Sequence, residues 1–195
     1  MHKIIVGADV SGNVCPRGQA MYIALVFGTP ESIEKSYRRI GIPSIHMSLL
    51  GKSKRRIIIQ NLDLSDKDLV VVCLHVQKQG IIEEILSDPR FQARNMPKVK
   101  LYRHFDYLLF RKIRDTIESF AFPRRCDLDD IIMQCDSDMV RTGTNWKMHT
   151  VDRGKAYEIA DVVAWCNMHD IQINQCKDID LASQIRMEMR HDLLK

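Results

Sequence analysis

Short apolar runs separated by turn residues predict the strands of this chain. Residues 3–9 and 21–27 are two such runs, and we expect them to pair as a hairpin around the loop at 11–19. Residues 69–76 form a continuous β-branched run, which is typical of a strand covered on both faces at the centre of a sheet. Two shorter strands are predicted at 44–48 and 131–136.

Helical periodicity fills much of the chain between and after these runs. The segment 30–40 has helix-start chemistry at Thr29 and a natural stop at Gly41. The segment 52–62 fits a helix, although its three consecutive isoleucines would also suit a strand. Further helices are predicted from residue 81, over 100–120, over 155–168 and over 182–194.

This order of elements predicts an α/β fold. An early hairpin, a buried strand, a helical stretch, a late strand and terminal helices combine into a mixed sheet covered by helices. A chain of 195 residues is long enough to bury a core without disulfides or structural metals, so we expect a single domain over residues 1–195.

Composition excludes several classes of protein. With 45% hydrophobic and 28% charged residues, the chain is neither disordered nor a membrane protein, and no apolar run approaches the ~20 residues of a membrane span. A strand-like pattern begins at Ile4 and leaves no room for a targeting signal, which predicts a cytoplasmic protein.

The cysteines favour neither zinc nor disulfides. They never form a C-x-x-C pair, and most lie in or beside apolar runs, so we expect reduced core thiols. The six are Cys15, Cys73, Cys126, Cys135, Cys166 and Cys176.

Basic residues are grouped, although the net charge is only +4. Such clusters would neutralise the phosphates of DNA or RNA, and a solvated helix face explains each cluster equally well. The groups are Arg38 and Arg39; Lys52, Lys54, Arg55 and Arg56; and, around the long predicted helix, Arg103, Arg111, Lys112, Arg114, Arg124 and Arg125.

Asp161 is the only ionisable residue in the apolar run 159–166. An uncompensated buried charge costs several kcal/mol, so a partner must meet this carboxylate. A metal ion would compensate it. So would a nearby arginine or a hydrogen bond to a backbone amide.

Further acids occupy comparable positions at strand ends. Asp9 closes the first apolar run, and Asp136 and Asp138 follow the late strand. All three also fit ordinary turn chemistry, and only one of Asp136 and Asp138 need be a ligand. Taken together with Asp161, they suggest a site for Mg²⁺ or Mn²⁺, at which water is activated and the leaving oxygen of a phosphodiester is stabilised.

Short motifs in this order resemble the ribonuclease H-like superfamily, and particularly an uncharacterised prokaryotic branch of it. They are Lys-Ile-Ile-Val-Gly-Ala-Asp-Val-Ser-Gly at 3–12, the strand at 21–27, Ser-Ile-His-Met-Ser at 44–48, the strand ending in Asp136, and Tyr-Glu-Ile-Ala-Asp at 157–161. The resemblance implies a five-stranded mixed sheet covered by helices on both faces. It also implies Asp9, Asp136 and Asp161 as catalytic, metal-binding acids, with Asp9 bridging the metals.

Two positions depart from this pattern. The strand at 69–76 ends without a carboxylate, and Ile45 replaces the acid often found before His46. His46 or His75 would serve as a ligand or proton carrier, although a histidine near an apolar strand is more often a satisfied core residue.

The combined expectation is a metal-dependent nuclease or phosphodiester-processing enzyme, in which basic helices hold DNA or RNA. One alternative is a catalytically silent nucleic-acid-binding or protein-interaction domain. A small-molecule phosphatase or nucleotidyl enzyme using the same acids is another. The nucleotide-binding glycine motifs and the common hydrolase motifs are absent from the sequence, and residues 142–146 suggest a surface loop anchored by Trp146.

Overall fold

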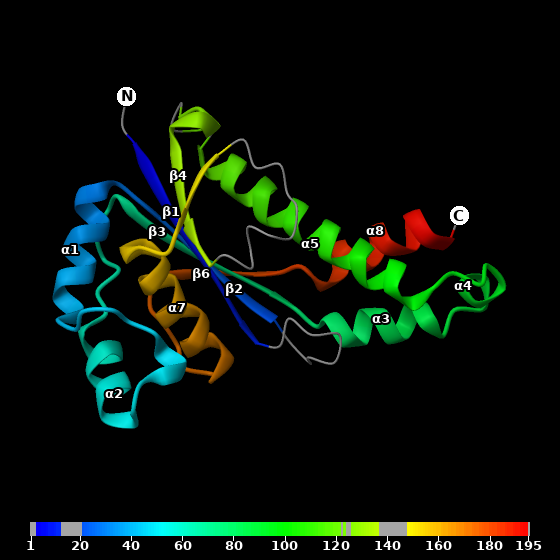
Figure 1. The fold of residues 1–195 in the computed structure, drawn as a ribbon, viewed down its shortest axis with the longest axis horizontal. Coiled ribbons are helices and arrows are strands. Elements are labelled where there is room, and N and C mark those ends of the chain that lie inside the picture. Colours follow the sequence, from blue (N-terminus) through cyan, green and yellow to red (C-terminus); the bar gives the residue numbers. More distant parts are fainter. Residues whose placement is uncertain (1–2, 13–20, 122, 124–125, 137–147, 195) are drawn as a thin grey trace.

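The computed structural model describes residues 3–12, 21–121, 123, 126–136 and 148–194. Within these residues the chain has an α/β fold built on a six-stranded mixed sheet in the order β5-β4-β1-β2-β3-β6 (Figure 1). The strands are β1 (Ile4–Gly12), β2 (Met21–Gly28), β3 (Leu69–Val76), β4 (Ile131–Cys135), β5 (His149–Asp152) and β6 (Cys176–Asp180).

Strand pairing confirms the predicted hairpin. β1 pairs antiparallel with β2, with Asp9 opposite Ala24, and β2 pairs antiparallel with β3. On the other side of β1, β4 and then β5 add in parallel, and β6 pairs in parallel with β3. β1 and β2 therefore lie at the centre of the sheet.

Three strand predictions were wrong. The sheet has six strands instead of five, because β5 and β6 are short polar edge strands without an apolar run to reveal them. Residues 44–48 form no strand, and a 3₁₀ turn, η1, spans Met47–Leu49. β3 is buried, but it is not central, since β6 alone follows it at the edge.

The predicted helices are confirmed to within a few residues, and residues 52–61 are helical despite their isoleucines. Thr29 caps the first helix by accepting a hydrogen bond from the Ser32 amide at 3.2 Å, and Gly41 ends it in a left-handed conformation. The helices are α1 (Pro30–Ile40), α2 (Lys52–Asn61), α3 (Lys78–Leu86), α4 (Pro89–Ala93), α5 (Lys98–Ala121), α7 (Lys155–Met168) and α8 (Ala182–Leu194).

Helices cover both faces of the sheet, as predicted. α1, α2 and α7 pack on one face, and α3, α5 and α8 pack on the other (Figure 1). Alternation along β1 directs Val6 and Ala8 toward α5, so Ile5, Gly7 and Asp9 lie on the face that carries α7.

α7 approaches β1 so closely that backbone meets backbone. A Cβ atom at Gly7 would lie 2.0 Å from the carbonyl oxygen of Ala156, closer than any side chain tolerates. The first turn of α7 is also held by β4, because the Gln134 side chain accepts a hydrogen bond from the Ala156 amide at 2.9 Å. Gly154, at a φ of 149°, leaves room for that side chain.

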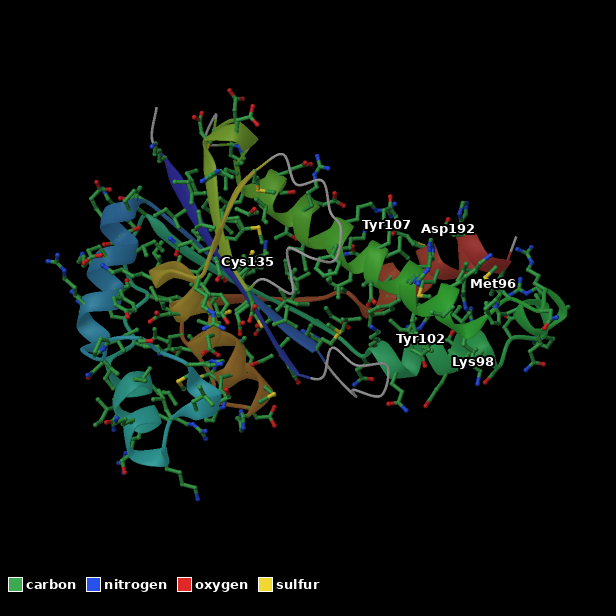
Figure 2. All side chains as sticks on the ribbon, in the orientation of Figure 1. Met96, Lys98, Tyr102, Tyr107, Cys135 and Asp192 are labelled. Atoms are coloured by element: carbon green, nitrogen blue, oxygen red, sulfur yellow. The ribbon has the colours of Figure 1, made fainter. Side chains whose placement is uncertain are left out.

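On the opposite face of the sheet, charged side chains of the helices pair with one another. Lys78 is buried, with its ammonium 2.6 Å from Asp106 and lying over the Phe105 ring. Arg111 and Lys112 both pair with Glu188 of α8, and Arg114 pairs with Glu118. Figure 2 shows the labelled Tyr102, Tyr107 and Asp192 on this helical side, apart from α7. This part of the predicted basic surface thus forms ion pairs within the chain.

The described cysteines are free thiols. Cys73, Cys135 and Cys166 are buried, as expected of core thiols, and burial raises the pKa of the Cys166 thiol to about 12. Cys126 and Cys176 are partly buried. Among the helices of the described segments, none combines the length and apolar character needed to cross a membrane.

The contact at Gly7 generates a stability prediction. Gly7→Ala forces β1 and α7 apart, and we expect a loss of about 1–3 kcal/mol in the free energy of unfolding by urea denaturation. Gly80→Ala is the matched control, because that exposed glycine of α3 has only the Gln77 side chain nearby, at 4.0 Å. It should stabilise the protein by up to about 1 kcal/mol. Equal effects of the two substitutions would contradict the close contact.

Candidate functional site

A cavity of about 450 Å³ lies between β1, η1 and one face of α7. Its lining contains the three acids that the sequence singled out within the described residues, Asp9, Asp136 and Asp161. Tyr157 and His46 line the same cavity. Asp138, the fourth predicted ligand, and the loop at 142–146 lie outside the described residues.

The sheet accounts for two of these positions. Asp9 lies within β1, three residues before its end and not at its tip as predicted, and projects toward α7 by strand alternation. The parallel register pairs Ala8 of β1 with Cys135 of β4, and Asp9 and Asp136 directly follow these two paired residues. Neighbouring strands lie about 4.8 Å apart, which brings both acids to one side of the cavity.

Asp161 is buried, with 5% of its surface exposed, and its compensation is visible. Its Oδ2 atom accepts a hydrogen bond from the backbone amide of Met47 at 2.8 Å and lies 3.2 Å from Nδ1 of His46. The partners that meet the Asp161 carboxylate are therefore a backbone amide and a histidine. The His46 side chain is half-exposed. The tautomer that donates from Nδ1 to Asp161 would leave Nε2 as an acceptor.

Glu158 is a site-shaping residue that sequence reasoning missed. Its Oε2 atom accepts hydrogen bonds from the Tyr37 hydroxyl at 2.6 Å and from the Ile45 amide at 2.7 Å. Glu158 and Asp161 are three residues apart and share a face of α7, so together they hold the backbone of residues 45–47. Their spacing was a usable signal, but nothing in the sequence identified the amides that they bind.

The electrostatics of Asp9 reflect its neighbours. Burial and the nearby Asp161 carboxylate raise the pKa of Asp9 to about 7, against the opposing effects of a hydrogen bond from Tyr157, a backbone amide and His46. Burial and the surrounding carboxylates likewise raise the pKa of the Tyr157 hydroxyl, which therefore stays a hydrogen-bond donor. Tyr157 was also missed as a site residue, because tyrosine in an apolar helix resembles ordinary core.

Asp136 and one of the two candidate histidines line the cavity together with the other acids. Asp136 lies 3.9 Å from the Arg153 guanidinium. His75 lines a different cavity, with Tyr22, and lies 3.7 Å from Asp180. Of the two candidate histidines, only His46 therefore joins the acids.

Two of the carboxylates that line the cavity could serve as ligands of a hard cation. Across the described segments, no group of three or more histidine, cysteine, aspartate or glutamate side chains is arranged to hold a metal ion. Asp9 and Asp161 nevertheless form a neighbouring pair whose mutual repulsion a cation would relieve. Mg²⁺ is commonly held by one or two carboxylates, with water and substrate phosphate completing its coordination, and this pair fits that pattern.

The remaining wall of the cavity is cationic and aromatic. Arg55, from the basic group at 52–56, lies with its guanidinium carbon 5.0 Å from the centre of the Trp165 ring. The His169 ring stacks on Trp165 with centroids 3.9 Å apart. Arg55 is thus the member of that basic group that reaches the cavity wall, within the part of the chain that is described.

Comparison with protein-family models, with curated proteins and with solved structures finds no match for this chain.

The environment of Asp9 predicts a pH dependence of stability. The pKa of Asp9 rises from 3.8 to about 7 on folding, so between these values the folded chain keeps a proton that the unfolded chain has released. Stability should therefore fall by up to roughly 1.4 kcal/mol per pH unit from about pH 4 to pH 7, and the penalty should be complete above pH 7. Asp9→Asn removes this penalty while its amide oxygen still accepts from Tyr157.

Urea denaturation in EDTA at pH 4.5, 6 and 8 measures the effect. The stability of Asp9→Asn relative to wild type should increase across this series. A difference between the two proteins that is the same at all three pH values would show that Asp9 ionises normally in the folded state.

Proposed function

We propose that this chain is a metal-dependent nuclease or related phosphodiester-processing enzyme of ribonuclease H-like fold, acting on nucleic acid. The observation that carries the proposal is the pairing of Asp9 and Asp161 in one cavity, where Asp161 helps to raise the pKa of Asp9. A partly buried carboxylate whose charge is disfavoured by a buried neighbouring carboxylate makes a favourable place for a divalent cation.

The sheet supports the fold proposal. Five contiguous strands, β5-β4-β1-β2-β3, form a mixed sheet with β1 in the middle, and β6 extends its β3 edge. Helices on both faces agree with the arrangement that the resemblance implies. Asp9 on β1, Asp136 after β4 and Asp161 on the covering helix α7 line one cavity, which supports assigning them as the metal-binding acids.

The proposed chemistry assigns roles to residues of this chain. Asp9 and Asp161 hold Mg²⁺ or Mn²⁺, and Asp136 contributes from the neighbouring strand. When bound, the metal activates water and stabilises charge on the phosphate oxygens. His46 holds a proton on Nδ1 against Asp161, and its Nε2 is available to accept one from water. The Tyr157 hydroxyl orients Asp9.

One observation favours the alternative of a catalytically inactive nucleic-acid-binding or protein-interaction domain. Oδ2 of Asp161 already serves Met47 and His46, so this carboxylate has a structural task without any metal. The strand β3 ends without an acid, and Ile45 occupies a position that is often acidic in the branch that the sequence resembles. Metal binding therefore separates the two candidates.

Thermal unfolding with and without Mn²⁺ tests the proposal. Wild type should gain stability, by about 2.7 kcal/mol at a free ion concentration of 100 times Kd. Asp161→Asn should lose that gain while its amide oxygen still accepts from Met47. Asp115→Asn, which removes an exposed carboxylate of α5, should respond like wild type.

Cleavage of labelled DNA and RNA is measured with the same proteins. Asp9→Asn and Asp161→Asn should reduce the rate more than about 100-fold, and Asp115→Asn should not change it. A wild-type protein that binds nucleic acid but neither responds to metal nor cleaves would establish the inactive alternative.

A further inference from the structure

Cavity-lining residues recur along one face of α7. Tyr157, Asp161 and Trp165 are spaced four apart, and Met168 continues the row into the last turn. At 1.5 Å of rise per residue, Asp161 and Trp165 are separated by about 6 Å along the helix axis. The cavity therefore extends along the helix, from an acidic end near Asp161 to an aromatic end near Trp165.

Arg55 is held in place at the aromatic end. Its Nε donates to the Met47 carbonyl at 2.8 Å, and its Nη2 donates to the Ser48 carbonyl at 3.1 Å. Guanidinium has five N–H donors, and these two bonds fix its plane while leaving its positive charge in the cavity wall. The amide of Met47 is bound to Asp161, so the cation and the acid are positioned by one residue.

The aromatic end contains a stack of two rings, Trp165 and His169. His169 donates from Nδ1 to the Trp165 carbonyl at 2.8 Å, which fixes the orientation of its ring against the indole. Met168, 38% exposed, adds an apolar side chain to the same wall. Unpaired bases stack on aromatic rings, and the exposed residue His169 extends the Trp165 ring stack at this end of the cavity.

We propose that Arg55, Trp165 and His169 form a subsite for one unpaired nucleotide, so that the chain takes single-stranded nucleic acid in preference to duplex. Arg55 binds the phosphate and the ring pair stacks the base. A cavity of about 450 Å³ is of the size that holds a small ligand. In a duplex the base faces are covered by their neighbours, so a stacking subsite selects an unpaired nucleotide. The inference rests on the proposed function for its substrate class and adds the strand preference.

Binding is measured in EDTA, where cleavage does not contribute. Fluorescence anisotropy of a labelled oligothymidylate reports affinity, with a hairpin duplex of equal charge and with thymidine monophosphate as competitors. The single strand should bind at least about tenfold more tightly than the hairpin. If thymidine monophosphate competes as well as the single strand at an equal concentration of phosphate groups, the pocket takes free nucleotides and the strand preference is overturned.

Matched variants locate the contact. Arg55→Gln and Trp165→Leu should each weaken single-strand binding about tenfold, and Trp165→Phe, which keeps a ring, should weaken it less. Arg56→Gln removes the same charge from an exposed position of the same helix and should change affinity less than about twofold. Circular dichroism and thermal unfolding check that each variant folds, and Arg55→Lys retains the charge if Arg55→Gln does not fold.

Tryptophan fluorescence supplies an independent signal. Trp146→Phe leaves Trp165 as the remaining tryptophan of the chain, and the single strand should quench its emission. Absence of quenching, or equal losses from Arg55→Gln and Arg56→Gln, would overturn the subsite. Specific binding in EDTA without later cleavage in Mn²⁺ would leave the subsite standing and reject the enzyme. If the protein cleaves single strands, but Arg55→Gln and Trp165→Leu leave the KM for them unchanged, the enzyme proposal would stand and the subsite would be rejected.

Discussion

Backbone contact between β1 and α7 is the constraint on which the site depends. Gly7 lets the carbonyl of Ala156 lie where a Cβ atom would otherwise be, and Gln134 fixes the same turn from β4. Two residues further along β1, Asp9 accepts a hydrogen bond from Tyr157 of α7 and lies near Asp161, one turn further along that helix. The distance between strand and helix therefore determines how strongly the carboxylates of Asp9 and Asp161 influence each other, and a larger residue at position 7 would alter the site without touching it.

Several elements of the fold were predictable from local pattern alone. The hairpin, the buried β3 strand and the amphipathic helices carry apolar residues at their proper periods, and α1 has its cap and stop signals in sequence. The edge strands β5 and β6 could not be found in this way, because they bury little surface and are held by backbone pairing with neighbours distant in the chain. The local periodicity of apolar residues reflects which side chains are buried, and β5 and β6 bury few side chains.

The candidate site could also be predicted from the sequence only in part. A lone carboxylate in an apolar run required a partner, and Asp161 has one. The identity of that partner, the amide of Met47, depends on how η1 packs against α7, which no local pattern encodes. Glu158 and Tyr157 were missed because their neighbours in sequence look like ordinary helix. The convergence of Asp9 with Asp136 follows from parallel register, which becomes known only once the strands are paired.

The backbone of Met47 gives the cavity a direction. An anion binds its N–H and a cation binds its carbonyl, which belong to successive peptide units, so each of these two peptide dipoles has a complementary charge at one end. The hydrogen bonds that hold Arg55 go to carbonyl oxygens, and its charge is therefore not cancelled by the acids across the cavity. The result is an electric field along α7. A ligand that carries separated charges would enter in one orientation, with its anionic end at Arg55 and its cationic end at the acids.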